Sequence, residues 1–219
     1  MNKNEKFVIS INREIGSGGR TVGRKLAEKL GVAFYDKAVI KALEEKFNLS
    51  VEDIEKRKGG EQSWWSEMKR MVNLGANGIN AARYFVPSED DNDDKMITDE
   101  MFRVEKDLLQ DIAKNESCVI AGRLGFYVLK DHPNHLNILI QASMPFRIER
   151  IMRKQGLSSK EAEKVIEKVD KMRENYVKEY TKTSRYDTRN YQLVISMDEL
   201  SEDDVVEHII DYINRTSKK

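Results

Sequence analysis

The sequence predicts an α/β fold built around a parallel sheet. Short apolar runs alternate along the 219 residues with segments of helical periodicity, which is the pattern that successive βαβ units produce. The clearest unit spans residues 6–30, where an apolar run is followed by a glycine-rich turn and then by an amphipathic segment. We expect strands at residues 6–12, 32–35, 117–121, 136–142 and 191–196.

The segments between these runs have the spacing of amphipathic helices. The first of them ends at Gly31, and glycine is common directly after a helix. Ser158 with Glu161 has the spacing of a capping box, and Ser201 with Asp204 is placed to cap the last helix. We expect helices at residues 21–30, 37–47, 99–114, 144–155, 159–180 and 202–214.

A glycine-rich turn, Gly-Ser-Gly-Gly-Arg-Thr, joins the first strand to the first helix. Glycines let the backbone come close to an anion, and the amide groups at a helix N-terminus point toward it. The turn therefore predicts a phosphate site in which the hydroxyl of Thr21 binds Mg²⁺. The alternative is a tight turn that uses its glycines for geometry alone. The residues of the predicted phosphate site are Gly16, Ser17, Gly18, Gly19, Arg20 and Thr21.

The turn departs from the phosphate-loop motif G-x-x-x-x-G-K-[S/T] because it has no lysine. Gly-Arg-Thr at residues 19–21 stands where Gly-Lys-Thr is expected, and Glu14 then takes the place of the first glycine. A second register matches the earlier glycines but puts a glycine at the lysine position. Arg20 can supply the charge, since a guanidinium stays protonated and binds phosphate oxygens in pairs. Arg13 and Arg24 flank the loop and remain alternatives.

Composition excludes several classes of function. Lys and Arg number 38, as do Asp and Glu, so the formal net charge is zero. Broad nucleic-acid binding needs a basic surface and is disfavoured. The single cysteine, Cys118, lies in an apolar run, and we expect a buried structural thiol. No apolar run approaches the ~20 residues of a membrane span. We expect a cytoplasmic monomer or homodimer with no membrane or nucleic-acid partner.

Residues 56–98 differ in character from the rest of the chain. They contain Trp64 and Trp65, and an acidic run at 89–94 that is typical of a surface loop. The two tryptophans pack either over the base or sugar of a ligand or between an inserted lobe and the core.

Three segments, in this order, resemble the nucleoside monophosphate kinases and most closely the cytidylate kinase-like family. They are residues 9–37 with the glycine turn, Cys118-Val-Ile-Ala-Gly-Arg123, and Leu139-Ile-Gln-Ala-Ser143 with the arginines that follow. Cytidylate kinases carry an acidic residue after the Gly-Arg pair, where this chain has Leu124. This departure and the absent lysine bear on the acceptor and on catalysis. The resemblance covers about residues 1–48 and 99–214.

The resemblance implies a P-loop kinase fold, with three α/β/α layers, a five-stranded parallel sheet, a small inserted acceptor lobe and an arginine-rich lid. It implies ATP-dependent transfer of a phosphoryl group, with Mg²⁺, to a nucleoside monophosphate, and CMP or dCMP is the expected acceptor. A kinase for another small metabolite and a nucleotide-binding regulatory protein without phosphotransfer are the alternatives. The single domain would comprise a core at about 1–36, 99–145 and 181–219, the lobe at about 37–98, and the lid with a long helix at about 146–180.

Charged residues at the predicted strand ends and on two helices are the candidates for these roles. Asp36 follows the second strand and Arg123 the third, and the carboxyl ends of parallel strands face one crevice. Asp36 would bind the acceptor sugar or orient Mg²⁺. The predicted catalytic residues are Arg20, Arg123, Arg147, Arg150 and Arg153, and the predicted acceptor-binding residues are Asp36, Arg123, Asp170 and Arg173.

Each assignment has a structural alternative. Asp36 would otherwise cap the following helix, and Arg123 would form a salt bridge with the inserted lobe. The three lid arginines would line a solvated helix face, and Asp170 with Arg173 would form an exposed i, i+3 ion pair. The segment before the last strand is expected to bracket the adenine or the lid through Tyr186, Asp187 and Arg189.

Overall fold

The computed structural model describes residues 1–36 and 99–217. The helix expected at 37–47, the inserted acceptor lobe with Trp64 and Trp65, and the acidic run at 89–94 lie outside the described residues.

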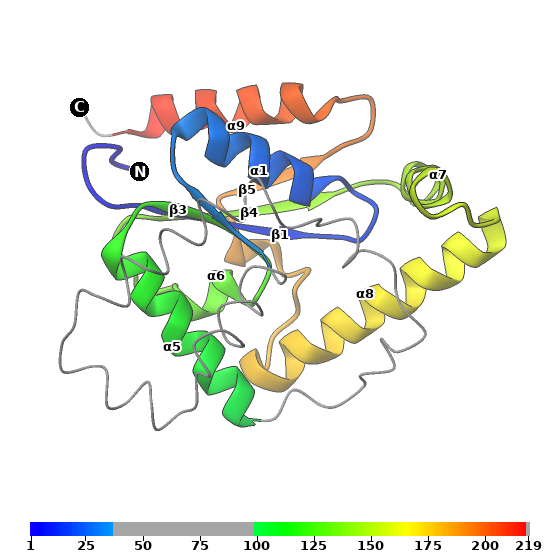
Figure 1. Cartoon of the computed structure of the whole chain (residues 1–219), viewed down its shortest axis with the longest axis horizontal. Coiled ribbons are helices and arrows are strands. Elements are labelled where there is room, and N and C mark those ends of the chain that lie inside the picture. Colours follow the sequence, from blue (N-terminus) through cyan, green and yellow to red (C-terminus); the bar gives the residue numbers. More distant parts are fainter. Residues whose placement is uncertain (37–98, 218–219) are drawn as a thin grey trace.

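The centre of the fold is a five-stranded parallel sheet with the order β2-β3-β1-β4-β5 (Figure 1). All of the predicted strands are present, and their bounds shift by one or two residues. Because β1 lies in the middle of the sheet, the loop that follows it opens at the centre of the carboxyl edge. The strands are β1 Val8–Arg13, β2 Ala33–Tyr35, β3 Cys118–Ala121, β4 His135–Gln141 and β5 Leu193–Ser196.

The described helices follow the predicted order with two short additions, α6 and the 3-10 helix η3. The capping boxes at Ser158 and Ser201 are both formed, so the starts of α8 and α9 are set by local hydrogen bonds. The additional helices have only four and three residues, which is too short to produce a periodic apolar pattern. The helices are α1 Gly19–Leu30, α5 Asp99–Asn115, α6 Gly125–Val128, α7 Met144–Gln155, α8 Ser159–Thr181, the 3-10 helix η3 Thr188–Asn190, and α9 Glu202–Thr216.

Helices cover both faces of the sheet, which gives the three predicted layers (Figure 1). Helices α1 and α9 pack on one face, where Val22 and Ile209 belong to the same apolar cluster as Ile11 and Ile138. Helices α5, α6 and α8 contribute to the cluster on the other face. Cys118 is buried in this second cluster as a free thiol, and burial raises its pKa above the ordinary range. The expectation of a structural thiol is therefore confirmed.

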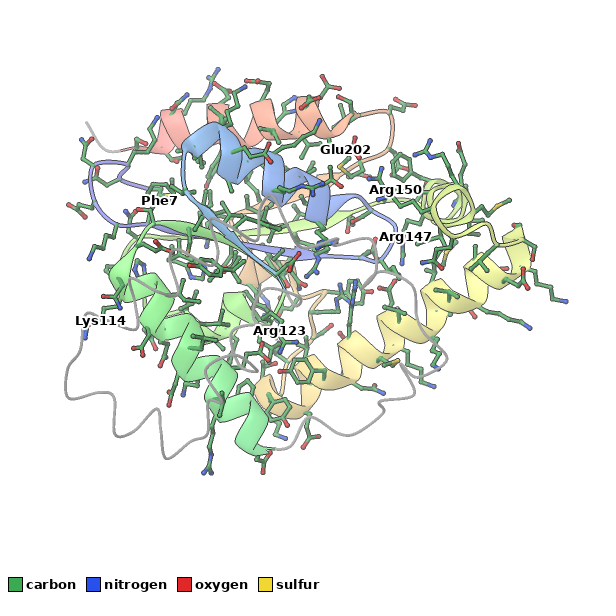
Figure 2. All side chains as sticks on the ribbon, viewed as in Figure 1. Phe7, Lys114, Arg123, Arg147, Arg150 and Glu202 are labelled. Atoms are coloured by element: carbon green, nitrogen blue, oxygen red, sulfur yellow. The ribbon has the colours of Figure 1, made fainter. Side chains whose placement is uncertain are left out.

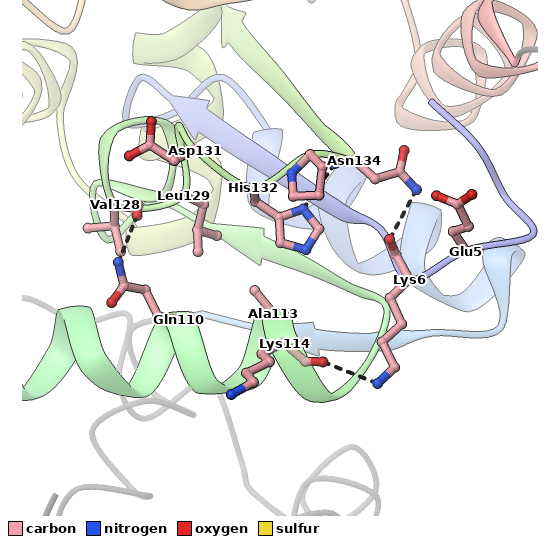
Figure 3. A pocket seen from close by; sticks show the side chains of 11 residues that line it. Glu5, Lys6, Gln110, Ala113, Lys114, Val128, Leu129, Asp131, His132 and Asn134 are labelled. Carbon is pink, nitrogen blue, oxygen red and sulfur yellow. Dashed lines mark hydrogen bonds between the residues drawn. The ribbon is translucent and has the colours of Figure 1, made fainter. Parts of the chain in front are cut away.

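The amino edge of the sheet carries a surface hollow of about 660 Å³ (Figure 3). It is lined by residues that precede β1, β3 and β4, among them Lys6, Lys114 and Asn134. The Lys6 ammonium donates a hydrogen bond to the carbonyl of Lys114 at 3.2 Å and so satisfies an acceptor at the end of α5. This hollow lies at the opposite edge from the glycine loop. Within the described residues, no helix is long and apolar enough to cross a membrane.

Candidate active site

The glycine loop occupies residues 14–18 between β1 and α1. Helix α1 begins at Gly19, so Arg20 and Thr21 lie in its first turn and Glu14 directly follows the strand. This arrangement agrees with the register in which Glu14 replaces the first motif glycine. Gly16 and Gly18 have φ angles of 81° and 87°, which L residues rarely adopt. Among the described residues, the amides of these two glycines have no hydrogen-bond acceptor.

Glu14 and Ser17 explain how the loop keeps its shape despite the altered motif. A carboxylate oxygen of Glu14 accepts a hydrogen bond from the amide of Ala142 at 3.1 Å, which joins the loop to the end of β4. The Ser17 side chain is fully buried, and its hydroxyl donates to the carbonyl of Glu14 at 3.0 Å. The residue that breaks the motif is thus an anchor of the loop.

Two of the three predicted lid arginines pack directly against this loop. Arg147 is 5% exposed, and its Nε donates to the carbonyl of Ile15 at 2.8 Å. A Cβ atom at Gly18 would lie 3.3 Å from the guanidinium carbon of Arg150. Arg153, by contrast, is exposed on the outer side of α7. The alternative of a solvated helix face therefore does not hold for Arg147 and Arg150.

Acidic partners position these arginines. Arg147 pairs with Asp170 and lies 3.4 Å from a carboxylate oxygen of Glu14. Arg150 pairs with Glu202 at 2.5 Å, where α7 meets the start of α9 (Figure 2). These carboxylates hold the two guanidiniums beside the loop.

Asp170 and Arg173 are both close to the loop, but they do not form an ion pair with each other. Asp170 accepts a hydrogen bond from the amide of Ile15 at 3.3 Å and pairs with Arg147 and Arg185. Arg173 instead donates to the carbonyl of Arg13 at 3.2 Å. Among the described residues, Asp170 and Arg173 form no ion pair with each other. The alternative of an exposed i, i+3 ion pair therefore does not hold, and each of the two residues makes its own contact from α8 to the loop.

The predicted residues at the ends of β2 and β3 are engaged with charged partners. The Nε of Arg20 lies 2.5 Å from a carboxylate oxygen of Asp36, which is 3% exposed. Arg123 pairs with the buried Glu105 of α5 (Figure 2). The alternative that Arg123 pairs with the inserted lobe concerns residues outside the described part of the chain.

The backbone after β3 is unusual. Gly122, Arg123 and Leu124 have successive φ angles of 82°, 56° and 53°. A residue other than glycine costs on the order of 1–3 kcal/mol in such a conformation, and strain of this kind concentrates at functional sites. This strained turn lies next to the side chain of Arg13, which ends the strand before the glycine loop.

Two arginines that contribute to the site were not among the predicted site residues. Arg185 is 1% exposed and donates to the carbonyl of Arg13, while its Nε has no partner among the described residues. Arg13, regarded only as a reserve cation, ends β1 inside the site. Arg185 lies between α8 and η3, where no periodic pattern marks a buried position. Tyr186 is partly exposed next to it, whereas Asp187 and Arg189 pair locally with each other.

The site carries a surplus of positive charge around Arg13. Burial, and then the nearby guanidinium of Arg173, lowers the pKa of Arg13 to about 9. Burial and the guanidinium of Arg185 lower the pKa of Arg173 to about 10. Both lowered pKa values arise first from burial and then from neighbouring positive charge, and a bound anion would offset these effects.

The described residues suit a Mg²⁺ ion that binds together with a nucleotide better than a metal ion held by several protein side chains. They contain no cluster of three or more His, Cys, Asp or Glu side chains suited to a metal ion. The hydroxyl of Thr21 is half-buried in the first turn of α1 and has no hydrogen-bond partner among the described residues. Mg²⁺ commonly takes few protein ligands and completes its shell with phosphate oxygens and water. Thr21 suits that kind of site.

The sheet order, the strand–glycine loop–helix unit and the arginines that converge on it define a protein of the P-loop kinase class. The model of the cytidylate kinase-like family matches residues 8–199. The chain therefore belongs to the cytidylate kinase-like family. A comparison with curated protein sequences found no match.

Solved structures agree with this fold. An uncharacterized protein from Eubacterium ventriosum is 25% identical, with a TM-score of 0.66 over 95% of this chain and 99% of that chain. Shikimate kinase from Acinetobacter baumannii, in complex with shikimate, is 16% identical, with a TM-score of 0.50 over 98% and 96% of the two chains. Shikimate kinase from Bacteroides thetaiotaomicron is 15% identical, with a TM-score of 0.51 over 95% and 98%.

Proposed function

We propose that this protein transfers the γ-phosphoryl group of ATP, with Mg²⁺, to a nucleoside monophosphate, and that CMP or dCMP is the acceptor. The observation that carries the proposal is the convergence of arginines from β1, α7, α8 and the segment after α8 on one glycine loop. Phosphoryl transfer needs little covalent chemistry from the protein. It needs two anionic substrates held in line and positive charge on the transferring group.

The loop and the first turn of α1 would bind the donor. The amides of Gly16 and Gly18 would donate to phosphate oxygens, and the hydroxyl of Thr21 would bind Mg²⁺, which offsets phosphate charge when bound. Arg147 and Arg150 would add charge from the other side of the loop. Arg153 lies on the exposed side of α7 and would reach the phosphates only after a movement of this helix.

The carboxyl ends of β2 and β3 would bind the acceptor. Arg123 would contact its phosphate, since a guanidinium binds phosphate oxygens in a bidentate way. Asp36 would accept a hydrogen bond from the sugar, and Arg173 would approach from α8 together with Asp170. Acceptor selection would depend in part on the inserted lobe at 37–98. The family and the parallel sheet also accommodate a kinase for another small metabolite.

A nucleotide-binding regulatory protein without phosphotransfer is the second candidate. The contact that favours it is the ion pair between Arg20 and Asp36, because it engages the only cation at the position of the motif lysine. A protein that only binds nucleotide does not need a free cation on the transferring phosphoryl group, so an Arg20 paired with Asp36 is compatible with this function.

An ADP-release assay with ATP and Mg²⁺ separates these functions. The acceptor panel comprises CMP, dCMP, UMP, AMP and GMP, together with a blank without acceptor. We expect acceptor-dependent turnover that falls at least 100-fold in Arg123→Ala, and a smaller loss in Arg123→Lys, which keeps a cation opposite Glu105. Arg103→Ala changes an exposed arginine on the same helix as Glu105 and should leave turnover unchanged. Binding of ATP without turnover on any acceptor would support the regulatory function.

A further inference from the structure

Arg13 follows an unusual path through the site. It is the last residue of β1, and its side chain passes close to Gly19 and ends beside Gly122. A Cβ atom at Gly19 would lie 2.6 Å from Cβ of Arg13, and one at Gly122 would lie 2.1 Å from its Nη1. At either position a side chain would force Arg13 to move. Glycines at these two positions therefore make room for the arginine between the start of α1 and the end of β3.

The guanidinium of Arg13 has no counter-ion of its own. Among the described residues it makes no hydrogen bond and no ion pair. The positive charges of Arg173, Arg185 and Arg20 repel this guanidinium, and the negative charge of Asp36 attracts it. Asp36 is already paired with Arg20 at 2.5 Å. Arg13 is only partly exposed, and a partly desolvated cation without a partner is costly, so an anion that binds here would be favoured.

The other two candidates for the role of the loop lysine are placed differently. Arg20 occupies the lysine position in the sequence, but its Nε is bound to Asp36. Arg24 is exposed one turn further along α1. Arg13 combines proximity to the first turn of α1 with a guanidinium directed to the end of β3, where the donor and acceptor regions meet.

We propose that Arg13 replaces the missing loop lysine and binds the γ-phosphate of the nucleotide donor. This inference rests on the proposed function, since it assigns the charge for the same transfer. In that transfer an acceptor phosphate oxygen forms a bond to the γ-phosphorus. The bond from this phosphorus to the β–γ bridging oxygen breaks, and ADP leaves with the electron pair. Arg13 stabilises the negative charge on the transferring phosphoryl group. Arg20 remains in its ion pair with Asp36.

The first test measures binding and does not require turnover. Dissociation constants of ATP and ADP, each with Mg²⁺, are measured by titration calorimetry for wild type, Arg13→Met, Arg13→Lys, Arg20→Met and Arg24→Met. A residue that binds the γ-phosphate affects ATP more than ADP. We expect Arg13→Met to reduce the preference for ATP over ADP about tenfold, Arg13→Lys to retain most of it, and Arg24→Met to leave it unchanged. An unchanged preference in Arg13→Met, or the larger loss in Arg20→Met, would overturn the inference.

Thermal unfolding distinguishes a ligand-binding arginine from a structural one. Because Arg13 carries an unpaired and partly desolvated charge, the apolar Arg13→Met side chain should leave the melting temperature of the ligand-free protein unchanged or raise it. ATP should raise the melting temperature of Arg13→Met less than that of wild type. A clear drop in the melting temperature of ligand-free Arg13→Met would show that the residue is structural and overturn the inference.

Turnover then separates this inference from the proposed function. If wild type is active, Arg13→Met should lower kcat on the order of 100-fold, as is typical when one group that stabilises developing charge is removed. If wild type shows no turnover on any acceptor, the proposed function fails while the ATP preference still decides the role of Arg13. Full kcat in Arg13→Met alongside loss in Arg20→Met would assign the charge to Arg20.

Discussion

Glu202 in the first turn of α9 pairs with Arg150 of α7, and the two side chains lie 2.5 Å apart beside the glycine loop. Partial burial is the largest single effect and would raise the pKa of Glu202. The hydrogen bond from Arg150, a backbone hydrogen bond and the charges of Arg150 and Lys25 together outweigh it, so the pKa is lowered. The carboxylate is therefore ionised at neutral pH and offsets one of the positive charges that face the loop.

Removal of this carboxylate should strengthen nucleotide binding. In Glu202→Gln, Arg150 keeps its charge but loses its counter-ion, so the positive potential at the loop rises. We expect the dissociation constant of ATP to fall about 3–10-fold at low salt, with a smaller effect at high salt.

The neighbouring Asp203 provides a matched control. It pairs with Lys25 at 2.7 Å on the exposed surface between α9 and α1. Asp203→Asn removes the same charge from the same helical turn and should leave ATP affinity within about twofold. Weaker ATP binding in Glu202→Gln would show that Glu202 acts mainly by positioning Arg150.

Substitution of Gly18 should impair both stability and nucleotide binding. Its φ angle of 87° disfavours an L residue, and a new Cβ atom would lie 3.3 Å from the guanidinium of Arg150. We expect Gly18→Ala to lower the free energy of unfolding by about 1–2 kcal/mol and to weaken ATP binding at least tenfold. Urea unfolding and calorimetry measure the two effects.

Gly31 separates the backbone effect from the contact. Its φ angle is 66°, and a Cβ atom there would meet nothing within 4 Å. Gly31→Ala should lower stability to a similar extent and leave ATP affinity unchanged. Equal ATP affinity in both variants would contradict a role for the geometry at Gly18 in binding.

Asp170 should contribute more to stability than an exposed carboxylate does. Its side chain is 13% exposed and joins α8 to the loop amide of Ile15 and to Arg147 and Arg185. Asp170→Asn leaves two buried guanidiniums with less counter-charge, and we expect a loss of about 2–4 kcal/mol in the free energy of unfolding. The control is Asp211→Asn, where a 60% exposed carboxylate pairs with Arg215. It should cost less than about 1 kcal/mol, and equal losses would contradict the prediction.

The stability of the fold should fall between pH 6.5 and 4 through His135. Burial lowers the pKa of His135 from 6.5 to about 4, and its Nε2 lies 2.8 Å from the hydroxyl of Ser10. In this window the unfolded chain binds a proton that the folded protein excludes. The free energy of unfolding therefore decreases as pH falls, with a slope that approaches about 1.4 kcal/mol per pH unit.

Two histidine variants test this pH dependence. His135→Gln should show a smaller slope between pH 6.5 and 4, whereas His208→Gln changes an exposed histidine and should keep the slope of wild type. The measurement is urea unfolding at a series of pH values. A slope in His135→Gln equal to that of wild type would assign the effect to other groups.

The fold was largely predictable because its signals are local. An apolar run such as the one from Val8 to Ile11 is buried on both sides of the sheet, and such runs alternate with helices in any parallel α/β fold. Capping residues such as Ser158 marked helix starts to within one residue. Helix α6 was missed because four residues do not complete an amphipathic pattern.

The candidate site was predictable only in part, because its contacts join distant segments. The glycine loop was visible as a contiguous motif. The pairing of Asp170 with Arg147 and Arg185, in contrast, depends on how α8 lies against the loop. Within a charged helix, the sequence alone does not distinguish an arginine that faces solvent from one that faces a phosphate site.

By itself the sequence determined the order of strands and helices, the glycine turn after β1 and the absence of a lysine in it, since these follow from neighbouring residues. The tertiary structure decided which arginines face that turn and which acid each one meets. It also showed that Arg13, and not only Arg20, enters the site. The physical reason is that burial and electrostatic interaction depend on distance in space, and the parallel sheet brings together charges that are more than 100 residues apart in the chain, as between Arg13 and Arg173.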